Sequence, residues 1–402
     1  MKKKTNNPTR AKFTVLRQLC NLIPPHLVPQ LARAHHSAEH ARTFSHWSHV
    51  VALLFAQLTH SLGLNDVCDA LRLHSGPLSA IRGATPPTRN GLSHANKIRP
   101  ALLAEQLFWK VLEHLQAHTP GFGYGHHTGR LRRFKRTIHV VDSTVIELVA
   151  NCLDWAKHRR RKAAAKCHLR LDLQSFLPRL VVIDTAREHD NVRARELCAP
   201  VKSGEIVIFD RGYLDQFHLQ DLSQRGVFWV TRAKENLVYD LIDTRPVGGA
   251  IRADELIMLR EGVLCRRITA RVELDGQERD MVFLCNHLEW SAQTIAELYR
   301  RRWEIEVFFK QLKQTLQLAD FLGHNANAVR WQVWTALLCY VLLRWHGWAS
   351  QWTGSFIRLW TLTRASLWQR LDLMAVLRSC GTAGGSFRVL GQPQAAYLPG
   401  FG

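Results

Sequence analysis

Apolar residues recur at three- and four-residue spacing through most of the first 115 residues. The segments 46–62 and 99–118 show this spacing most clearly, and it is typical of helices packed in a core. Proline-containing turns separate the helical segments, at residues 23–25, 75–77 and 85–87. The pattern predicts a small all-α domain over residues 1–118. Residues 79–97 have the length of a helix-turn-helix, although other helical bundles give the same pattern.

The pattern changes after a glycine-rich stretch at residues 119–125, which marks a domain boundary. Short segments rich in β-branched residues follow, such as TIHVVDSTVIEL, RLVVIDT, EIVIFD and VFWVTRAK, with a helical segment among them. This mixture predicts a mixed α/β sheet. We expect residues 126–345 to form one α/β domain.

Residues 235–288 have a stronger strand pattern than the segments around them. Asp275-Gly276 stands between two such segments and gives the clearest hairpin pattern in the chain. We expect a β-rich insertion into the α/β domain here. Beyond residue 345 we expect a C-terminal helical region and, from about Gly381, a loosely ordered tail, together covering residues 346–402.

The segment from Glu297 to Leu316 contains neither Pro nor Gly, and we expect it to form one helix. At about 100° per residue, five polar side chains fall within an arc of roughly 80°; they are Tyr299, Arg302, Glu306, Lys310 and Lys313. A solvated basic face would show the same pattern. A single glutamate among an arginine, a tyrosine and two lysines is more typical of a site for a metal and phosphates.

The chain has 402 residues, of which 46% are hydrophobic, and this is enough for two or three domains with real cores. Its 54 Lys and Arg residues against 33 Asp and Glu give a net charge of +21. A protein this basic most often binds a polyanion, and nucleic acid is the commonest one. An anionic membrane surface or a ribosomal setting fits the charge equally well.

No targeting or membrane-spanning segment is visible in the sequence. The basic N-terminus runs into no apolar signal-peptide core, and no stretch reaches the ~18 apolar residues needed to span a bilayer. Nine cysteines are widely scattered without a C-x-x-C pair, which indicates free thiols in a reducing compartment. We therefore expect a cytoplasmic protein.

Five histidines lie close together in the N-terminal region, at positions 35, 36, 40, 46 and 49. The spacing of His36 and His40 would suit two metal ligands on one helix face. No cysteine or carboxylate arrangement completes such a site, so solvated or DNA-facing histidines fit the pattern better.

Two aspartates stand directly after patterns of buried strands. Asp142 follows the apolar run IHVV, and Asp210 follows IVIF. A buried carboxylate is costly without a cation or hydrogen bonds, although a cap at a strand end would explain either residue alone. Together with Glu306 they make three carboxylates, which can hold two divalent metal ions. Two metals are the usual device for splitting a phosphodiester.

The segment from residue 126 to 170 is strongly basic. It holds twelve Lys and Arg against three acidic residues, a net charge of +9, and it flanks Asp142. Such residues would hold a DNA backbone against the carboxylates, with binding that weakens as salt rises. For the run Arg159 to Lys162, a solvated loop is an equally good interpretation.

The motifs resemble those of a known family. The spacing Tyr299-x2-Arg302-x3-Glu306-x6-Lys313 is similar to the YREK signature of the transposases called the insertion sequence four family, within the DDE superfamily. Asp142-Ser143-Thr144 and Asp210-Arg211-Gly212-Tyr213 resemble the family's first and second Asp motifs. The resemblance extends to Lys166-x-His168, to Asp320-Phe321-Leu322-Gly323 and to the N-terminal helical region. It therefore covers the chain up to about residue 345.

The resemblance implies an α/β fold with an RNase H-like mixed sheet core and a β-rich insertion, preceded by a small all-α, DNA-binding domain. It implies that Asp142, Asp210 and Glu306 bind two Mg²⁺ ions, for which Mn²⁺ would substitute. The implied DNA contacts are Tyr299, Arg302, Lys310, Lys313, Lys166, His168 and Arg211, with Trp303 and Trp229 as aromatic partners of a flipped base. Core packing is the alternative for both tryptophans, and the better one for Trp229.

The implied activity is that of a bacterial cut-and-paste transposase, nucleoid-associated when bound to DNA. It would free a 3′-hydroxyl at each element end, with a DNA hairpin as one route, and join it to target DNA. The partners would be double-stranded DNA, at terminal inverted repeats and target, and a second copy in a homodimer. The alternatives are a nuclease that cleaves without joining and a catalytically silent DNA-binding relative, which the three intact acidic positions disfavour.

Overall fold

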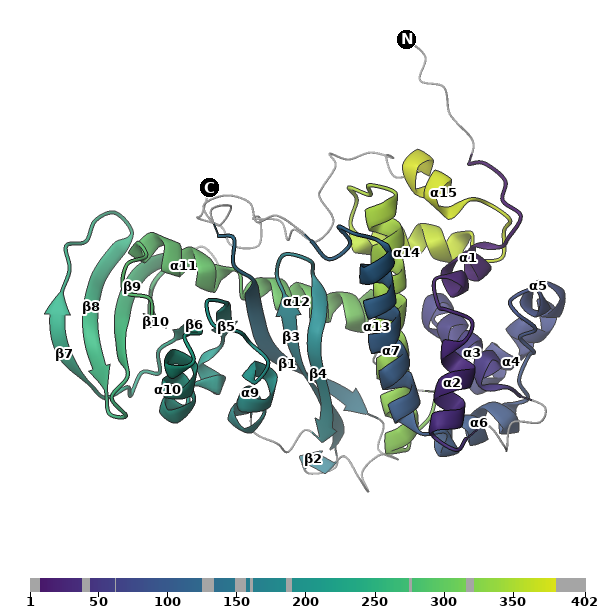
Figure 1. The fold of residues 1–402 in the computed structure, drawn as a ribbon, viewed down its shortest axis with the longest axis horizontal. Coiled ribbons are helices and arrows are strands. Elements are labelled where there is room, and N and C mark those ends of the chain that lie inside the picture. Colours follow the sequence, from purple (N-terminus) through teal and green to yellow (C-terminus); the bar gives the residue numbers. More distant parts are fainter. Residues whose placement is uncertain are drawn as a thin grey trace, which may run out of the picture. The chain divides into compact units, whose positions relative to one another are not determined.

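The computed structural model describes most of the chain (Figure 1), namely residues 8–37, 44–61, 63–124, 134–148, 157–159, 162–185, 190–274, 277–315 and 322–380. The Asp275-Gly276 turn, Asp320-Phe321 and the tail from Gly381 lie outside these ranges. The chain divides into two compact units. The helical unit comprises residues 1–122, 146–164 and 310–392, and the sheet unit comprises residues 123–145, 165–309 and 393–402. The domain boundaries expected from the sequence stay a prediction.

The N-terminal part of the helical unit is all-α, as expected. Its helices are α1 (Val15–Asn21), α2 (Leu27–Ala34), α3 (His46–Thr59), α4 (Leu64–Leu73), α5 (Ser75–Ser79), α6 (Arg89–Ile98) and α7 (Ala101–His118). Side-chain oxygens of Thr14, Ser45 and Thr88 cap α1, α3 and α6. Residues 79–97, which have the length of a helix-turn-helix, contain the last residue of α5 and most of α6, with a connection at residues 80–88 between them. Pro86 and Pro87 keep the preceding connection out of a helix.

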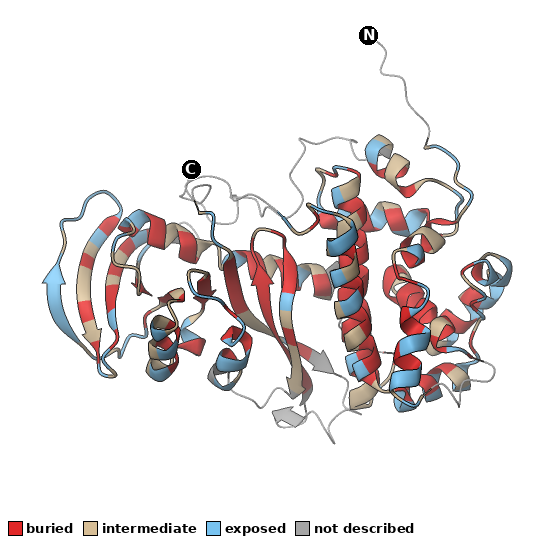
Figure 2. Cartoon of the chain, viewed as in Figure 1, coloured by how far each residue is buried: buried red, intermediate tan, exposed pale blue. Residues whose placement is uncertain are grey.

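The helical unit is completed by segments from the C-terminal half of the chain. They are the π-helical turn η5 (Gln311–Thr315), α13 (Ala326–Ala349), α14 (Phe356–Ala365) and α15 (Leu373–Cys380). α13 is apolar on all sides and is therefore buried along most of its length (Figure 2). It packs against α3, α6 and α7 from the N-terminal region.

The described strands form one mixed sheet of ten strands. The first six are β1 (Ile138–Leu148), β2 (Lys157–Arg159), β3 (Lys162–Asp172), β4 (Leu177–Thr185), β5 (Ile206–Phe209) and β6 (Phe228–Arg232). β1, β5 and β6 run parallel to one another, whereas β3 and β4 are antiparallel. This arrangement confirms the predicted mixed α/β fold with an RNase H-like core.

The β-rich region extends the same sheet beyond β6. Its strands are β7 (Tyr239–Thr244), β8 (Ile251–Leu259), β9 (Leu264–Leu274) and β10 (Gln277–Cys285), in the order β6-β10-β9-β8-β7. β9 and β10 pair antiparallel with Leu274 opposite Gln277, as the predicted hairpin requires. β7 lies at the edge, and Figure 2 shows it largely exposed.

Helices cover both faces of the sheet within the sheet unit. In Figure 1, α9 (Asp190–Cys198) and α10 (Gln216–Gln224) lie in front of the strands, and α11 (Ala292–Arg300) and α12 (Trp303–Lys310) run behind them. The single helix expected from Glu297 to Leu316 is therefore wrong. It breaks after Arg300 and continues as η5 after Lys310. The arc of five polar residues assumed one continuous helix, and the break at Arg301 and Arg302 interrupts it.

No single helix among the described residues is long and apolar enough to cross a membrane; α3 and α4 pass that test only together, as a pair bent by 104°. Seven cysteines of the described chain are free and buried, which confirms the expected free thiols at positions 20, 68, 167, 198, 265, 285 and 339.

Candidate active site

The two aspartates after apolar strand segments lie on neighbouring parallel strands. In the register of β1 and β5, Val141 is opposite Phe209, so Asp142 and Asp210 are the next residues along each strand. Both strands are buried up to that point, because their apolar side chains belong to the core. The sheet thus brings together two carboxylates that are far apart in the sequence.

Tyr299 on α11 holds the second of these carboxylates. Its hydroxyl donates a hydrogen bond of 2.8 Å to Oδ1 of Asp210. Its ring packs against Phe283 of β10, with ring centroids 4.9 Å apart. Burial raises the pKa of the Tyr299 hydroxyl, so it stays a proton donor at neutral pH.

Arg302 lies between α11 and α12 and joins two carboxylates. Its Nη1 donates to Oδ2 of Asp142 at 3.1 Å, and its Nη2 donates to Oε1 of Glu306 at 2.7 Å. Glu306 lies in the first turn of α12, four residues after Arg302, which is close enough for the pair to meet. Arg302 and Tyr299 therefore connect Asp142, Asp210 and Glu306 into one polar cluster.

The cluster carries an excess of negative charge. Burial raises the pKa of Asp142 to about 6, and the charges of Asp210 and Glu306 act in the same direction. Arg302 opposes this shift, as does the backbone N–H of Ser143, which donates to Oδ1 of Asp142 at 2.8 Å. Burial alone would lower the pKa of Arg302. Tyr299 and the carboxylates raise the pKa by more than burial lowers it, so the arginine stays charged.

The donor set fits a divalent metal ion by its chemistry, because carboxylate oxygens are the ligands that Mg²⁺ prefers. Among the described residues, however, no three acidic, histidine or cysteine side chains gather closely enough around one point to hold an ion. The guanidinium of Arg302 instead supplies the positive charge between Asp142 and Glu306. A metal ion at these two carboxylates would compete with the guanidinium for their oxygens.

Four residues predicted to contact DNA have side chains that solvent reaches. Trp303, the first residue of α12, is 39% exposed, and Arg211 forms an ion pair of 3.7 Å with Glu235. Lys310 is the exposed last residue of α12, and Lys313 is half-buried in η5. The two lysines belong to the helical unit.

Three other predicted DNA contacts lie on core strands. Trp229 of β6 is fully buried, and its indole N–H donates to Oγ of Ser223 at 2.9 Å. His168 of β3 is also fully buried, whereas Lys166 on the same strand is half-buried opposite Asp184. DNA could reach Trp229 or His168 only if the core opened, so the packing interpretation fits Trp229 better.

One acidic residue near the site was missed from the sequence. Glu304 is 1% exposed and forms an ion pair with Arg301 at the junction of α11 and α12. Burial raises the pKa of its carboxyl to about 8, although Arg301 opposes the shift. Its place two residues before Glu306 turns it about 200° around the helix, away from the polar cluster. The two-residue separation of Glu304 from Glu306 was the sequence feature that could have shown that Glu304 faces away from the site.

Two segments of the chain match known protein families. Residues 133–342 match the family described as the transposase DDE domain, and residues 11–81 match a domain of unknown function. The match spans the sheet core, both aspartates and Glu306. The chain belongs to the transposase DDE domain family.

Curated relatives carry transposase names. Protein y4zB of Sinorhizobium fredii, named as a transposase, is 30% identical over 73% of this chain and 81% of its own length. A Geobacillus stearothermophilus protein named as the transposase of insertion sequence element IS5377 is 31% identical over 54% of this chain and 59% of its own length. Transposase InsG of element IS4 of Escherichia coli is 23% identical over 43% of this chain and 42% of its own length. These relatives confirm the resemblance to the insertion sequence four family, and the chain is a DNA transposase that depends on a divalent metal.

Among solved structures, the chain is similar to the piggyBac transposase in a synaptic complex with hairpin DNA. The TM-score is 0.47 at 9% identity, over 94% of this chain and 85% of that chain.

Proposed function

We propose that this transposase cleaves the ends of an insertion sequence and joins them to target DNA at a centre formed by Asp142, Asp210 and Glu306. The observation that carries the proposal is the pair of contacts from Arg302 to Asp142 and Glu306, with the Tyr299 hydroxyl on Asp210. Three carboxylates from two strands and a helix thereby share one polar cluster in a half-buried setting. Such a cluster is typical of a hydrolytic metal site.

The three carboxylates would hold two Mg²⁺ ions, with Mn²⁺ as a substitute. When bound, the ions would activate the attacking oxygen and stabilise the leaving oxygen of the phosphodiester. Asp142 must lose its proton to bind a metal, and its pKa of about 6 allows this at neutral pH. Tyr299 orients Asp210 by donating to one of its two oxygens, which leaves the other oxygen available as a ligand.

Arg302 would exchange partners when DNA arrives. Its planar guanidinium now satisfies two carboxylates, and a phosphate offers the same two-oxygen geometry. A DNA phosphate beside α12 would compete for the guanidinium and release Asp142 and Glu306. The carboxylates would then be freed for metal only when DNA is in place.

We assign the remaining DNA contacts by the solvent exposure of each side chain. We assign DNA phosphates to Lys310, Lys313 and Arg211, and a flipped base to Trp303, whose indole is 39% exposed beside Arg302. Lys166 is kept as a further phosphate contact. Trp229 and His168 are left to the core because both are fully buried.

The DNA partner would be double-stranded and would comprise terminal inverted repeats and a target site. A homodimer would bring two element ends together, so that both ends join the target in a coupled way. A DNA hairpin would be one route by which the freed 3′-hydroxyl releases the element.

The proposal is tested by three single variants, Asp142→Asn, Asp210→Asn and Glu306→Gln. Each should reduce cleavage of end-bearing duplexes by roughly three orders of magnitude, because several kcal/mol of charge stabilisation are lost. Binding of the same duplexes should stay largely intact. Asp221→Asn on α10 is the matched control, since its side chain is 57% exposed and lies outside the cluster. Unchanged cleavage in all three variants would place the active site elsewhere.

Pre-cleaved ends separate a transposase from a nuclease on the same core. Incubated with target DNA and Mg²⁺, the wild-type chain should give joined product. Cleavage of intact ends with no joined product from pre-cleaved ends would assign the nuclease activity instead.

A further inference from the structure

A buried ion pair joins two strands of the β-rich region. Arg266 of β9 is 2% exposed, and Asp254 of β8 is 6% exposed. Nε of Arg266 donates to Oδ1 of Asp254 at 3.0 Å, and Nη2 donates to Oδ2. The two charges offset each other in a desolvated place, and both carboxylate oxygens have a partner. The remaining guanidinium nitrogen, Nη1, is directed outside the pair.

Nη1 of Arg266 binds the link between β10 and α11, which comprises residues 286–290. It donates to the backbone carbonyl of Leu288, at 3.4 Å, and to that of Trp290. Arg245 adds a further contact to the Leu288 carbonyl through its own Nη1. Because α11 begins two residues after Trp290, these contacts fix the backbone immediately before the first turn of the helix.

Asp254 compensates a cation that would otherwise oppose the helix. The N-terminal end of a helix carries partial positive charge, so a lone guanidinium beside the start of α11 would be unfavourable. A buried guanidinium without a counter-ion would also lose its hydration without replacement. Asp254 offsets both costs and, by accepting from two nitrogens, holds the guanidinium plane in the orientation that directs Nη1 to the link. Asp254 therefore acts on α11 through Arg266.

The same face of the sheet holds the other end of α11. Asp254 is opposite Ile268 of β9, and Ile268 is opposite Phe283 of β10, so these three side chains lie on one face. Phe283 packs on the ring of Tyr299, with the ring centroids 4.9 Å apart. The β-rich region thus holds α11 at its start through the buried ion pair and near its end through Phe283. With the helix held at both ends, the Tyr299 hydroxyl reaches Oδ1 of Asp210.

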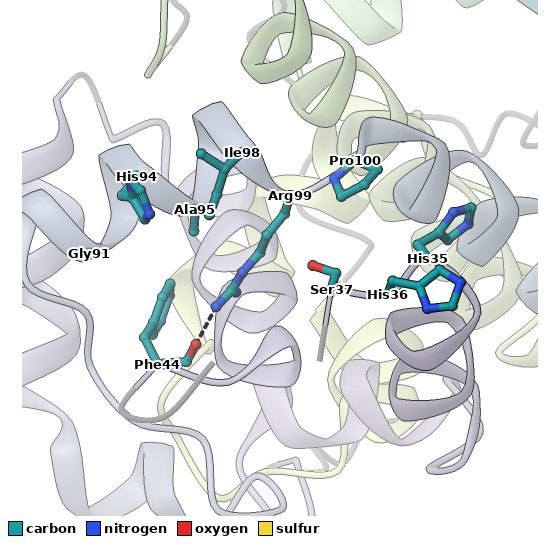
Figure 3. A pocket seen from close by; sticks show the side chains of 10 residues that line it. All are labelled: His35, His36, Ser37, Phe44, Gly91, His94, Ala95, Ile98, Arg99 and Pro100. Atoms are coloured by element: carbon teal, nitrogen blue, oxygen red, sulfur yellow. Dashed lines mark hydrogen bonds between the residues drawn. The ribbon is translucent and has the colours of Figure 1, made fainter. Parts of the chain in front are cut away.

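A buried arginine also fixes the start of a helix in the helical unit. Arg99 is 6% exposed, and its guanidinium donates to the backbone carbonyls of Phe44 and Ser45, directly before α3. Figure 3 shows the Arg99 side chain directed at the Phe44 carbonyl. None of the residues assigned to the carboxylate cluster lies on α3. Arg99 is therefore the reference for a contact of this kind whose helix carries no active-site residue.

We propose that Asp254 and Arg266 are positioning residues of the active site. The pair sets the start of α11, and α11 presents the Tyr299 hydroxyl to Asp210. The inference rests on the proposed function for the role of Asp210 in cleavage, whereas the placement of Tyr299 by the pair does not depend on that role. It gives the β-rich region a part in the reaction, because two of its strands hold the helix that orients a carboxylate.

The test is a double-variant cycle in the full chain, with Arg266→Lys and Tyr299→Phe made singly and together. Lysine keeps the charge but lacks the planar fork, so it cannot hold Asp254 and the link at once. Single-turnover cleavage of a bound end-bearing duplex should slow roughly tenfold in Tyr299→Phe and roughly fivefold in Arg266→Lys. The double variant should match Tyr299→Phe within about twofold, because the hydrogen bond that Arg266 supports is already gone. Losses that multiply, to roughly fiftyfold, would show that Arg266 does not act through Tyr299 and would overturn the proposal.

Urea melts of the same proteins test the placement of Tyr299 without activity. Tyr299→Phe should lower the midpoint of unfolding in the wild-type background and leave it nearly unchanged in the Arg266→Lys background, where the hydroxyl no longer meets Asp210. Arg99→Lys is the matched control background, because it weakens the same kind of contact at the start of α3. There, Tyr299→Phe should lower the midpoint by its full amount. Equal shifts in all three backgrounds would overturn the proposal.

A further variant and one further measurement keep the outcomes separate. If Arg266→Lys does not fold by circular dichroism, Arg245→Gln takes its place in both cycles, since half-buried Arg245 donates to the same Leu288 carbonyl. Unchanged cleavage in Asp210→Asn would reject the proposed catalytic centre, and the urea melts would still decide whether the pair places Tyr299. Loss of cleavage in Asp210→Asn, together with independent effects of the two cycle variants, would reject the positioning role alone.

Discussion

Nη1 of Arg302 lies 3.1 Å from Oδ2 of Asp142, a residue 160 positions earlier in the chain. Both side chains are 17% exposed, so the pair is screened much less than a surface ion pair. The contact ties the junction of α11 and α12 to strand β1. The contact also places the guanidinium of Arg302 beside Asp142, whose negative charge it compensates.

Replacing Arg302 by Gln should destabilise the metal-free protein and make it respond more strongly to metal. Without the guanidinium, the carboxylates repel one another, and the free energy of unfolding at pH 8 should fall by about 1–3 kcal/mol. Ca²⁺ or Mg²⁺ should then raise the melting temperature of the variant more than that of the wild type, because no arginine competes for Asp142 and Glu306. Thermal melts with and without metal measure both effects.

The control for this prediction is Arg195→Gln, which removes an exposed arginine paired with Asp215 at 3.5 Å in the same unit. It should change neither stability nor the response to metal by much. If Arg302→Gln and wild type gain the same stability from metal, the guanidinium does not compete with the ion and the exchange of partners is wrong.

Tyr299→Phe isolates the hydrogen bond to Asp210. The variant keeps the ring and its packing on Phe283 but loses the hydroxyl, so stability should fall by only about 1 kcal/mol. Cleavage should fall by roughly tenfold, because Asp210 is no longer held in one orientation. Single-turnover cleavage and binding of one end-bearing duplex measure the effect. A large loss of binding with normal single-turnover cleavage would show that Tyr299 serves DNA and not Asp210.

The strands that carry Asp142 and Asp210 could be predicted because the local pattern decides them. Ile138, Val140 and Val141 precede Asp142, with His139 among them, and the run IVIF precedes Asp210; such mostly β-branched runs form buried strands wherever they pack. Parallel pairing of β1 with β5 then places the two aspartates side by side, because each follows the last apolar residue of its run. The hairpin around Asp275-Gly276 was predictable for a similar local reason.

The break at Arg301 and Arg302 could not be predicted in this way. No Pro or Gly there marks the end of a helix, so the local pattern favours a continuous one. Arg302 reaches Asp142, while Arg301 reaches the buried Glu304, and backbone hydrogen bonds of the i to i+3 type tighten the chain between α11 and α12. The position of Trp229 was open for a related reason, because a tryptophan on a strand is buried or exposed according to what covers the sheet.

Acid should unfold the helical unit at a mildly low pH. Burial lowers the pKa of His49 to about 3 and that of His346 to about 4, and both side chains are almost fully buried. Their folded-state pKa values lie below the unfolded value near 6.5, so the unfolded state binds more protons as the pH falls from 6.5 towards 4. Each histidine contributes stability that is fully present above pH 6.5 and is lost as the pH falls towards its folded-state pKa. The loss is on the order of 3 kcal/mol for each histidine.

Urea melts between about pH 8 and pH 4.5 measure this loss. His346→Gln should flatten the dependence, since glutamine does not titrate. Asp142 has the opposite effect over part of this range, because its pKa in the folded protein is raised to about 6. As the pH falls from 6 towards the ordinary aspartate pKa, the folded protein binds this proton first, and the protein gains stability from Asp142. Asp142→Asn should therefore steepen the net loss on acidification. A stability that does not change between pH 7 and pH 5 in the wild type would contradict the buried neutral histidines.

Lys310→Ala tests whether α12 itself follows the DNA backbone. Lys310 lies four residues after Glu306, on the same side of one helix, and its side chain is exposed. A phosphate held there would add one counterion-releasing contact, so the variant should bind end-bearing duplexes several-fold more weakly, with a salt slope shallower by about 1. Lys110→Ala, an exposed lysine of α7, is the matched control. Cleavage of the bound fraction should be unchanged if the role of Lys310 is to hold a phosphate, because that role contributes to binding and not to the chemical step. If affinity and salt slope both match the control, the place of Lys310 beside Glu306 is incidental, and the DNA path must leave α12 before its last turn.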